Sequence, residues 1–232
     1  MSFENVGLGR RFRRRIVIDQ LDVGVRGLLR PSRSNVDYEP DRVELRELRG
    51  GDHRAVEQLR QANRIWLTPW EASSPEANRM PLTMERYVYQ ADQDARNGVG
   101  LMFGILVDGE LLGQISLSSI TRGSGLRGSI GYWVAQSAAG RGLAPLVVAM
   151  LTDWAIFELG LHRIEIFIRP ENAASLRVVD KLGLRLEGYH EAYMHINGQW
   201  ADHLGFAVVR EEIAEDGGLV ARLERFMNLR ES

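Results

Sequence analysis

The pattern of hydrophobic and polar positions between Ser129 and Gly188 predicts an ordered series of strands and helices. Ser129 to Val134 (SIGYWV) is short and rich in β-branched and aromatic residues, as is typical of a strand. From Leu143 to Phe157 the apolar residues recur three and four positions apart, which predicts a helix. Gly160 follows this stripe and predicts its C-terminal end.

A second strand and a second helix follow in the same stretch. In His162 to Arg169 (HRIEIFIR) isoleucine alternates with other residues, so one face of this strand is expected to be buried. Asn172 to Leu182 predicts a helix closed by Gly183. The order strand, glycine turn, helix, strand, helix places two strands side by side with a ligand cleft between them.

Two hairpins flank this series. Asp108-Gly109 separates the apolar runs Leu101–Val107 and Leu111–Leu117, and Asn197-Gly198 separates Leu184–Ile196 from Gln199–Val209. Asp-Gly and Asn-Gly suit the tight turns that connect antiparallel strands. A further strand is expected at Val43–Leu48. Helices are expected after Asp52 as N-cap, at Met84–Ala95 and at Leu219–Met227.

Residues 1–40 differ from the rest and are expected to form an N-terminal extension and linker. Five arginines between positions 10 and 15 form a basic cluster, interpreted as a solvated tail in preference to a contact site for RNA or acidic protein. Ile16, Ile18, Leu21, Val23 and Val25 leave a strand or hairpin open as an alternative. The expected main domain spans 41–213, and 214–232 is expected to form a C-terminal helix.

Composition narrows the class of protein. The 232 residues are 44% hydrophobic and 26% charged, as in globular proteins with a proper core. A net charge of −2 argues against nucleic-acid binding as the main function, and no apolar run is long enough to span a bilayer. The absence of cysteine excludes a thiolate nucleophile and a thiolate metal site. The expected location is the cytoplasm, and no metal site is expected, because His53 and His162 lack ligand spacing.

The turn Ala139-Gly140-Arg141-Gly142-Leu143-Ala144 is the first candidate binding site. A glycine turn at a helix start lets the backbone approach a ligand and directs unpaired N–H groups at anionic oxygens. A phosphate or pyrophosphate is therefore the expected guest. Pro145 is compatible with this helix start, because the first turn does not use its N–H.

Three motifs in this order resemble the GNAT superfamily of acyl-CoA-dependent N-acyltransferases. They are GYWV followed by AGRGLA, then PENAASLRVVDKLG, then LRLEG with the hairpin after it. Within the superfamily the chain is most similar to the RimJ/RimL type, which acetylates the N-terminal amine of ribosomal proteins. The resemblance covers about Val43 to Glu211. It implies an α/β fold with a mixed, mostly antiparallel sheet that splays near Val134 to admit acetyl-CoA.

The resemblance also implies roles for individual residues. The backbone N–H groups from Gly140 to Ala144 would hold the CoA pyrophosphate, and the backbone of Trp133 and Val134 would pair with the pantetheine arm. Asn172 would bond the same arm. Ser175 would protonate the leaving thiolate, with Tyr193 as a second candidate acid.

Simpler interpretations of three of these residues stand beside the functional ones. Ser175 could serve only as a hydrogen-bonding residue at its helix start, and Tyr193 only as a sheet residue. Trp66 and Trp70 are candidates for the wall of a substrate groove, or are core or lid aromatics. The Asp202-His203 pair is interpreted as a structural contact rather than a proton relay.

Two positions depart from the family pattern. Ala139 stands where the family's loop usually begins with Gln or Arg, and Met194 stands where the ribosomal-protein enzymes carry a Glu that orders a water or base. Glu191 and His195 alternate with Tyr193 and are expected on its face of the strand, so either could order such a water. An α-amine with a pKa near 7.7–8.0 needs only a weak base, whereas a lysine amine near 10.4 needs more.

The expected reaction is direct acetyl transfer from acetyl-CoA to an amine, most simply the N-terminus of a protein such as a ribosomal protein. The alternatives are a small-molecule amine or a lysine side chain as acceptor, or an acyl-CoA-binding domain without catalysis. No direct nucleic-acid or membrane partner is expected, and the protein is expected to be a monomer or homodimer.

Overall fold

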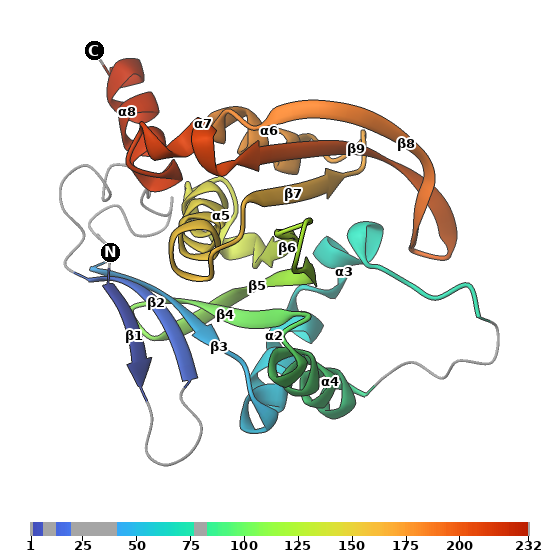
Figure 1. Ribbon diagram of the computed structural model, residues 1–232. Helices are drawn as coiled ribbons and strands as arrows, with labels where there is room; N and C mark the ends of the chain where they lie inside the picture. Colours follow the sequence, from blue (N-terminus) through green and yellow to red (C-terminus); the bar gives the residue numbers. More distant parts are fainter. Residues whose placement is uncertain (1, 7–12, 20–40, 77–82, 232) are drawn as a thin grey trace.

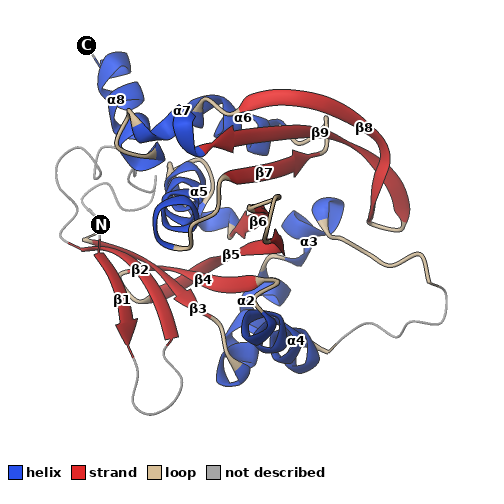
Figure 2. Cartoon of the chain, in the orientation of Figure 1, coloured by secondary structure: helices blue, strands red, loops and turns tan. Residues whose placement is uncertain are grey.

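The computed structural model describes residues 2–6, 13–19, 41–76 and 83–231. Within these ranges, nine strands form one sheet in the order β1-β2-β3-β4-β5-β6-β7-β9-β8 (Figures 1 and 2). Every neighbouring pair is antiparallel except β6 and β7, which are parallel. The mixed, mostly antiparallel sheet expected from the sequence is confirmed.

The strands that carry the sheet follow the predicted alternation. Their bounds are β1 Ser2–Val6, β2 Arg13–Asp19, β3 Arg42–Glu47, β4 Leu101–Val107, β5 Glu110–Thr121, β6 Arg127–Val134, β7 Arg163–Ile168, β8 Arg185–Ile196 and β9 Gln199–Val209. Both predicted hairpins are present, and the turn residues Asp108, Gly109, Asn197 and Gly198 all take positive φ angles, as their turn type requires.

Helices cover both faces of the sheet. Their bounds are α2 His53–Ala62, α3 Arg64–Leu67, α4 Met84–Asn97, α5 Leu143–Asp153, α6 Ala173–Leu182, α7 Arg210–Ala214 and α8 Leu219–Glu231, with short 3-10 turns η1 Gly50–Asp52, η2 Thr68–Trp70 and η3 Gln136–Ala138. A π-helical segment, Trp154–Glu158, continues α5 towards Gly160. Asp52 occupies the expected N-cap position of α2, but its carboxylate accepts the N–H of Arg49, 2.9 Å away, instead of a helix N–H.

Two adjacent residues of β5 show which helices lie on which face. Gln114 Nε2 donates to the hydroxyl of Tyr87 on α4 over 3.0 Å. The neighbouring Ile115 is fully buried in the main core with Leu146 and Met150 of α5. Because successive side chains of a strand point to opposite faces, α4 and α5 cover opposite faces of the sheet (Figure 1).

The N-terminal strands correct one expectation. β2 pairs with β3, and Ile16 is fully buried there, so the sheet begins earlier in the chain than residue 41. Arg13–Arg15 lie in β2, and Arg15 Nε contacts Glu44 Oε1 at 2.9 Å, so the solvated-tail interpretation is wrong for Arg15. Arg10, Arg11, the apolar positions 21–25 and the expected linker to residue 40 lie outside the described residues.

The C-terminal helix is held in place by a buried carboxylate. Asp153, at the end of α5, is 3% exposed and accepts the N–H groups of Leu219 (2.7 Å) and Val220 (3.0 Å) at the start of α8. Gly218 has a φ of 111°, and a Cβ there would lie 2.6 Å from Asp153 Oδ2, so glycine is needed for this close approach. α8 is thereby joined to the helix that follows the glycine turn.

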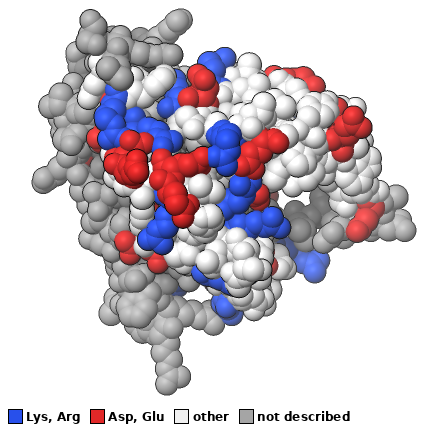
Figure 3. Space-filling model, turned by 45° about the horizontal axis from the view of Figure 1, so that its top comes forward, with Lys and Arg blue, Asp and Glu red and all other residues white. Residues whose placement is uncertain are grey.

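The charged side chains are mixed over the surface. Figure 3 shows basic and acidic groups interspersed on the visible face, without a broad field of one sign. Among the described residues, no helix has the length and apolarity to cross a membrane.

Candidate functional site

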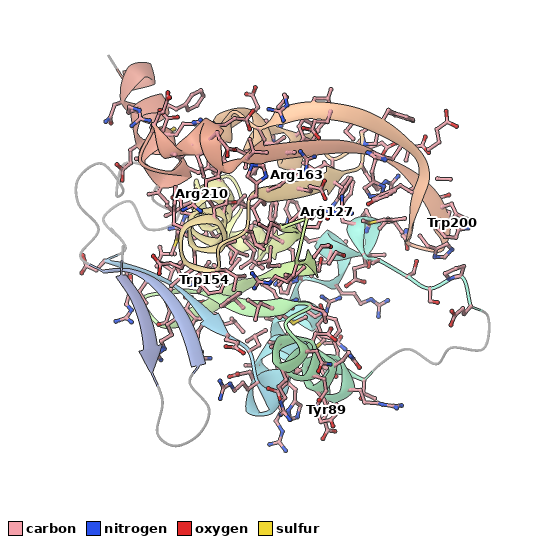
Figure 4. All side chains as sticks on the ribbon, viewed as in Figure 1. Tyr89, Arg127, Trp154, Arg163, Trp200 and Arg210 are labelled. Atoms are coloured by element: carbon pink, nitrogen blue, oxygen red, sulfur yellow. The ribbon has the colours of Figure 1, made fainter. Side chains whose placement is uncertain are left out.

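The two parallel strands at the centre of the sheet separate after a short contact. β6 and β7 pair only from Arg127, Gly128 and Ser129 to residues 163–165. Figure 4 shows Arg127 and Arg163 near this paired end. From Ile130 onwards β6 has no β7 partner, so one edge of Tyr132 to Val134 faces an opening. The expected splay is present.

The predicted glycine turn lies at the mouth of this opening. Gly140 and Gly142 take positive φ angles of 75° and 86°. Gly142 is the N-cap of α5, and no side chain caps the helix there. The N–H groups of Leu143 and Ala144 therefore lack an intrahelical acceptor, and Pro145 has no N–H, so the turn can offer amides and a positive dipole to an anion.

The second helix start faces the same opening. Asn172 is the N-cap of α6, and its Oδ1 accepts the backbone N–H of Ser175 over 3.0 Å. The N-terminal bond of the helix thus uses the main chain of Ser175 and leaves its hydroxyl available. Nδ2 of Asn172 is likewise left for another acceptor.

A cavity of about 650 Å³ joins these features. It has the size expected of a small-molecule site. Its lining residues are Trp66, Leu67, Trp70, Tyr132, Trp133, Val134, Ala138, Ala139, Gly140, Gly142, Ala144, Pro145, Glu171, Asn172, Ala173, Ala174, Ser175, Arg177, Val178 and Lys181. Most of the residues predicted for the site meet in this one cavity. Of the predicted turn, Arg141 and Leu143 are not in the lining, and Leu143 is buried in the core.

The two tryptophans form one wall of the cavity. Trp66 Nε1 donates to the main-chain carbonyl of Val134 over 3.1 Å. The guanidinium of Arg169 lies 5.8 Å from the ring centre of Trp70 and also donates to the carbonyl of Pro69 over 3.1 Å. Arg169 follows β7, so it ties this wall to the far side of the opening.

The segment after Trp70 contacts the end of β8. Ala72 bridges Ile196 at the end of β8, and Ser73 N–H donates to the carbonyl of His195 over 2.8 Å. Ser73 Oγ also lies 2.9 Å from Nδ1 of His195. The hairpin β8–β9 extends to Trp200 at its far end (Figure 4). His195 therefore contacts this segment, and the centre of its ring lies 5.6 Å from the centre of the Trp200 ring.

Two buried polar atoms in the cavity wall have no hydrogen-bond partner among the described residues. They are the hydroxyl of Tyr132 and Nε1 of Trp133. Burial raises the pKa of the Tyr132 phenol to about 12, and the nearby Ser175 hydroxyl offsets part of this rise without meeting it in hydrogen-bond geometry. Tyr132 was not predicted as a site residue. The alternation of SIGYWV, which places it on the side of the buried Ile130, was the signal available.

Tyr193 lies outside the cavity lining. Its ring contacts Phe167, His190 and His203 at centroid distances of 4.6, 4.9 and 5.8 Å. Burial raises the pKa of the Tyr193 hydroxyl and lowers the pKa of His203. The Nδ1 of His203 lies 3.0 Å from the carbonyl of Ala201, and Asp202 accepts instead from Tyr189 and the N–H of Ala192.

The expectation that Glu191 shares a face with Tyr193 is wrong. β8 is irregular between His190 and Met194, and Ala192 has a φ of 46°. This bulge breaks the alternation, so Tyr193 packs against His190, three positions away. Among the described residues, no three His, Asp or Glu side chains gather as metal ligands.

Comparisons with known proteins agree with this geometry. The sequence profile described as "Acetyltransferase (GNAT) domain" matches residues 42–185. The chain is 38% identical over 112 residues to "Probable N-acetyltransferase YjcK" of Bacillus subtilis, which covers 47% of this chain and 62% of that protein, just under two thirds of its length. It is 28% identical over 144 residues to the ribosomal protein uS5-alanine N-acetyltransferase of Escherichia coli, covering 61% of this chain and 74% of that protein.

A solved structure gives the same result. Mycobacterium smegmatis RimJ in complex with CoA-disulfide matches with a TM-score of 0.71 and 34% identity, covering 78% of this chain and 87% of that one. That matched structure contains a CoA group. The glycine turn and the cavity described above suit a ligand that carries phosphate groups, as CoA does.

Proposed function

Because the chain belongs to the GNAT acetyltransferase family, we propose that it transfers the acetyl group of acetyl-CoA to the N-terminal α-amine of a protein, such as a ribosomal protein. The observation that carries the proposal is the cavity in which the uncapped start of α5, Asn172 and Ser175 converge beside the opening between β6 and β7.

The residues present suit acetyl-CoA as the donor substrate. The free amides at Leu143 and Ala144 and the dipole of α5 suit a pyrophosphate. Arg177 and Lys181 line the same cavity and add positive charge. Asn172 Nδ2 can donate to an amide carbonyl of the pantetheine arm. The resemblance implies that the backbone of Trp133 and Val134 pairs with the pantetheine arm. The Val134 carbonyl already accepts a hydrogen bond from Trp66, so another main-chain group would make this contact.

The reaction is a direct transfer. The amine lone pair forms a C–N bond to the acetyl carbon, the C–S bond breaks, and its electron pair leaves with sulfur. Ser175 gives a proton to the thiolate and takes one back from water, and the amine loses its proton to water. No cysteine exists to carry the acetyl group on the enzyme.

One comparison supports a protein N-terminus as the acceptor. A relative 28% identical to this chain is named for acetylating the alanine of ribosomal protein uS5. An α-amine is also substantially neutral near pH 8, so a water chain suffices as base.

The test is thiol release from acetyl-CoA with peptides bearing N-terminal Ala, Ser or Thr, with internal-lysine peptides, and with polyamines. We expect turnover on the N-terminal peptides and a fall in kcat of about 100-fold in Ser175→Ala. Ser118→Ala is the matched control, because its Oγ bonds the carbonyl of Ser129 at 3.2 Å on another strand, outside the cavity lining.

Other outcomes would replace the proposal. Turnover on polyamines or lysine alone would keep the chemistry and discard the protein N-terminus. Tight binding of acetyl-CoA with no turnover on any acceptor would favour a binding domain without catalysis.

A further inference from the structure

The hydroxyl of Tyr132 is a buried donor without a partner in a ligand cavity. It makes no hydrogen bond to any described residue, although its side chain lines the cavity wall. Leaving a buried hydroxyl unpaired destabilises a fold. Native proteins satisfy most buried polar groups, and the exceptions call for an explanation such as a ligand.

The position of Tyr132 indicates which part of the ligand it would meet. It lies on β6 past Ser129, the last residue paired with β7. Ser175 approaches from the start of α6, close enough to affect the phenol. Two hydroxyl groups from the two sides of the opening therefore converge on one region.

The chemistry of the phenol limits its role. Burial keeps its pKa near 12, so it stays protonated at every physiological pH. A permanently protonated phenol donates a hydrogen bond and does not act as a base. Its natural partner is an oxygen or sulfur atom that gains negative charge.

We propose that Tyr132 is a thioester-binding residue: its O–H donates to the thioester group of bound acetyl-CoA, next to Ser175. This inference rests on the proposed function and adds a residue to it. Tyr132 keeps its proton throughout. It supports the charge that moves from the attacked carbonyl to sulfur, while Ser175 supplies the proton that the thiolate takes up.

The experiment compares Tyr132→Phe with wild type in three measurements: urea unfolding without ligand, acetyl-CoA affinity by calorimetry, and thiol release. We expect an unfolding midpoint equal to or above that of wild type, because an unpaired buried hydroxyl is removed. Acetyl-CoA affinity is expected to fall about tenfold and kcat to fall at least as much. Tyr89→Phe is the control, since Tyr89 is 61% exposed on α4 (Figure 4), and it should match wild type in all three.

Unchanged acetyl-CoA affinity in a folded Tyr132→Phe would overturn the inference. A lowered unfolding midpoint without ligand would also overturn it, because the hydroxyl would then have a structural partner. Calorimetry needs no acceptor, so it decides this inference even if no acceptor is turned over and the proposed function fails.

Discussion

The indole N–H of Trp66 is hydrogen-bonded to the main-chain carbonyl of Val134, 3.1 Å away. This bond joins the tryptophan wall of the cavity to the free edge of β6. It also occupies a backbone group that the family resemblance implies would pair with the pantetheine arm. Trp66 is thus expected to shape the edge on which the substrate lies, as well as the wall beside it.

Replacing Trp66 with Phe keeps an aromatic wall but removes the donor. We expect the free energy of unfolding to fall by about 1–2 kcal/mol, since the Val134 carbonyl loses its partner and the smaller ring packs less well. The KM for acetyl-CoA is expected to rise, because the edge of β6 becomes less rigid. Urea unfolding and steady-state kinetics measure the two effects. A wild-type KM with lowered stability would restrict Trp66 to a structural role.

Gly140 and Gly160 offer a matched pair of substitutions. Both have nearly the same positive φ, 75° and 74°, and a Cβ on either would meet nothing within 4 Å. Each Gly→Ala change should therefore cost a similar 1 kcal/mol or so of stability. Only Gly140 lines the cavity, so only Gly140→Ala is expected to weaken acetyl-CoA binding. Equal affinities in the two variants would argue against the turn as the phosphate site.

Asp153 is expected to make stability depend on pH. Burial raises the pKa of its carboxyl from 3.8 to about 6, against the opposing effect of its bonds to α8 and of Arg222. A raised pKa means that the contribution is complete below pH 4 and is lost as pH rises through 6. The loss is on the order of 3 kcal/mol.

Asp153→Asn provides the comparison for that effect. Asparagine does not titrate. The unfolding free energy of wild type, measured relative to that of the variant, should therefore fall by about 3 kcal/mol from pH 4 to pH 7. Other carboxyl groups titrate equally in both proteins and cancel. Urea unfolding at several pH values measures the difference, and a difference that is constant with pH would show that the Asp153 pKa is not raised.

Tyr193 and Ser175 are the two candidate acids, and their positions differ. Ser175 lines the cavity, whereas Tyr193 lies in the aromatic group with Phe167 and His190. We expect Tyr193→Phe to keep kcat within about twofold of wild type, far from the effect of removing a general acid. A loss like that of Ser175→Ala would return Tyr193 to the role of acid.

The sequence predicted the elements well where a local apolar or turn pattern marks them. The isoleucines of β7, the stripe of α5 and the two glycine hairpins each carry a local signal, and all proved correct. The predicted glycine turn and Asn172 also meet in one cavity, because their positions follow directly from helix starts.

Features that depend on long-range contacts escaped prediction. The bond from Trp66 to Val134 joins residues 68 positions apart, and no local pattern marks it. The missing partner of the Tyr132 hydroxyl is a property of the packed cavity. The apolar positions from Ile16 to Val25 leave a strand open because nearby glycines weaken the pattern, and pairing of β2 with β3 decides the outcome. No sequence pattern predicted β1.

The bulge at Ala192 carries a final consequence, which concerns insertions and deletions. Between the pairs His190–His203 and Met194–Ala201, β8 advances four positions while β9 advances two, so the bulge around Ala192 holds two extra residues and the residues after it keep their faces. Loss of Ala192 alone would leave one extra residue, so regular pairing would return only with a slip in register or a second deletion. In this part of β8, the number of residues in the bulge therefore matters as much as their identity for where each side chain lies.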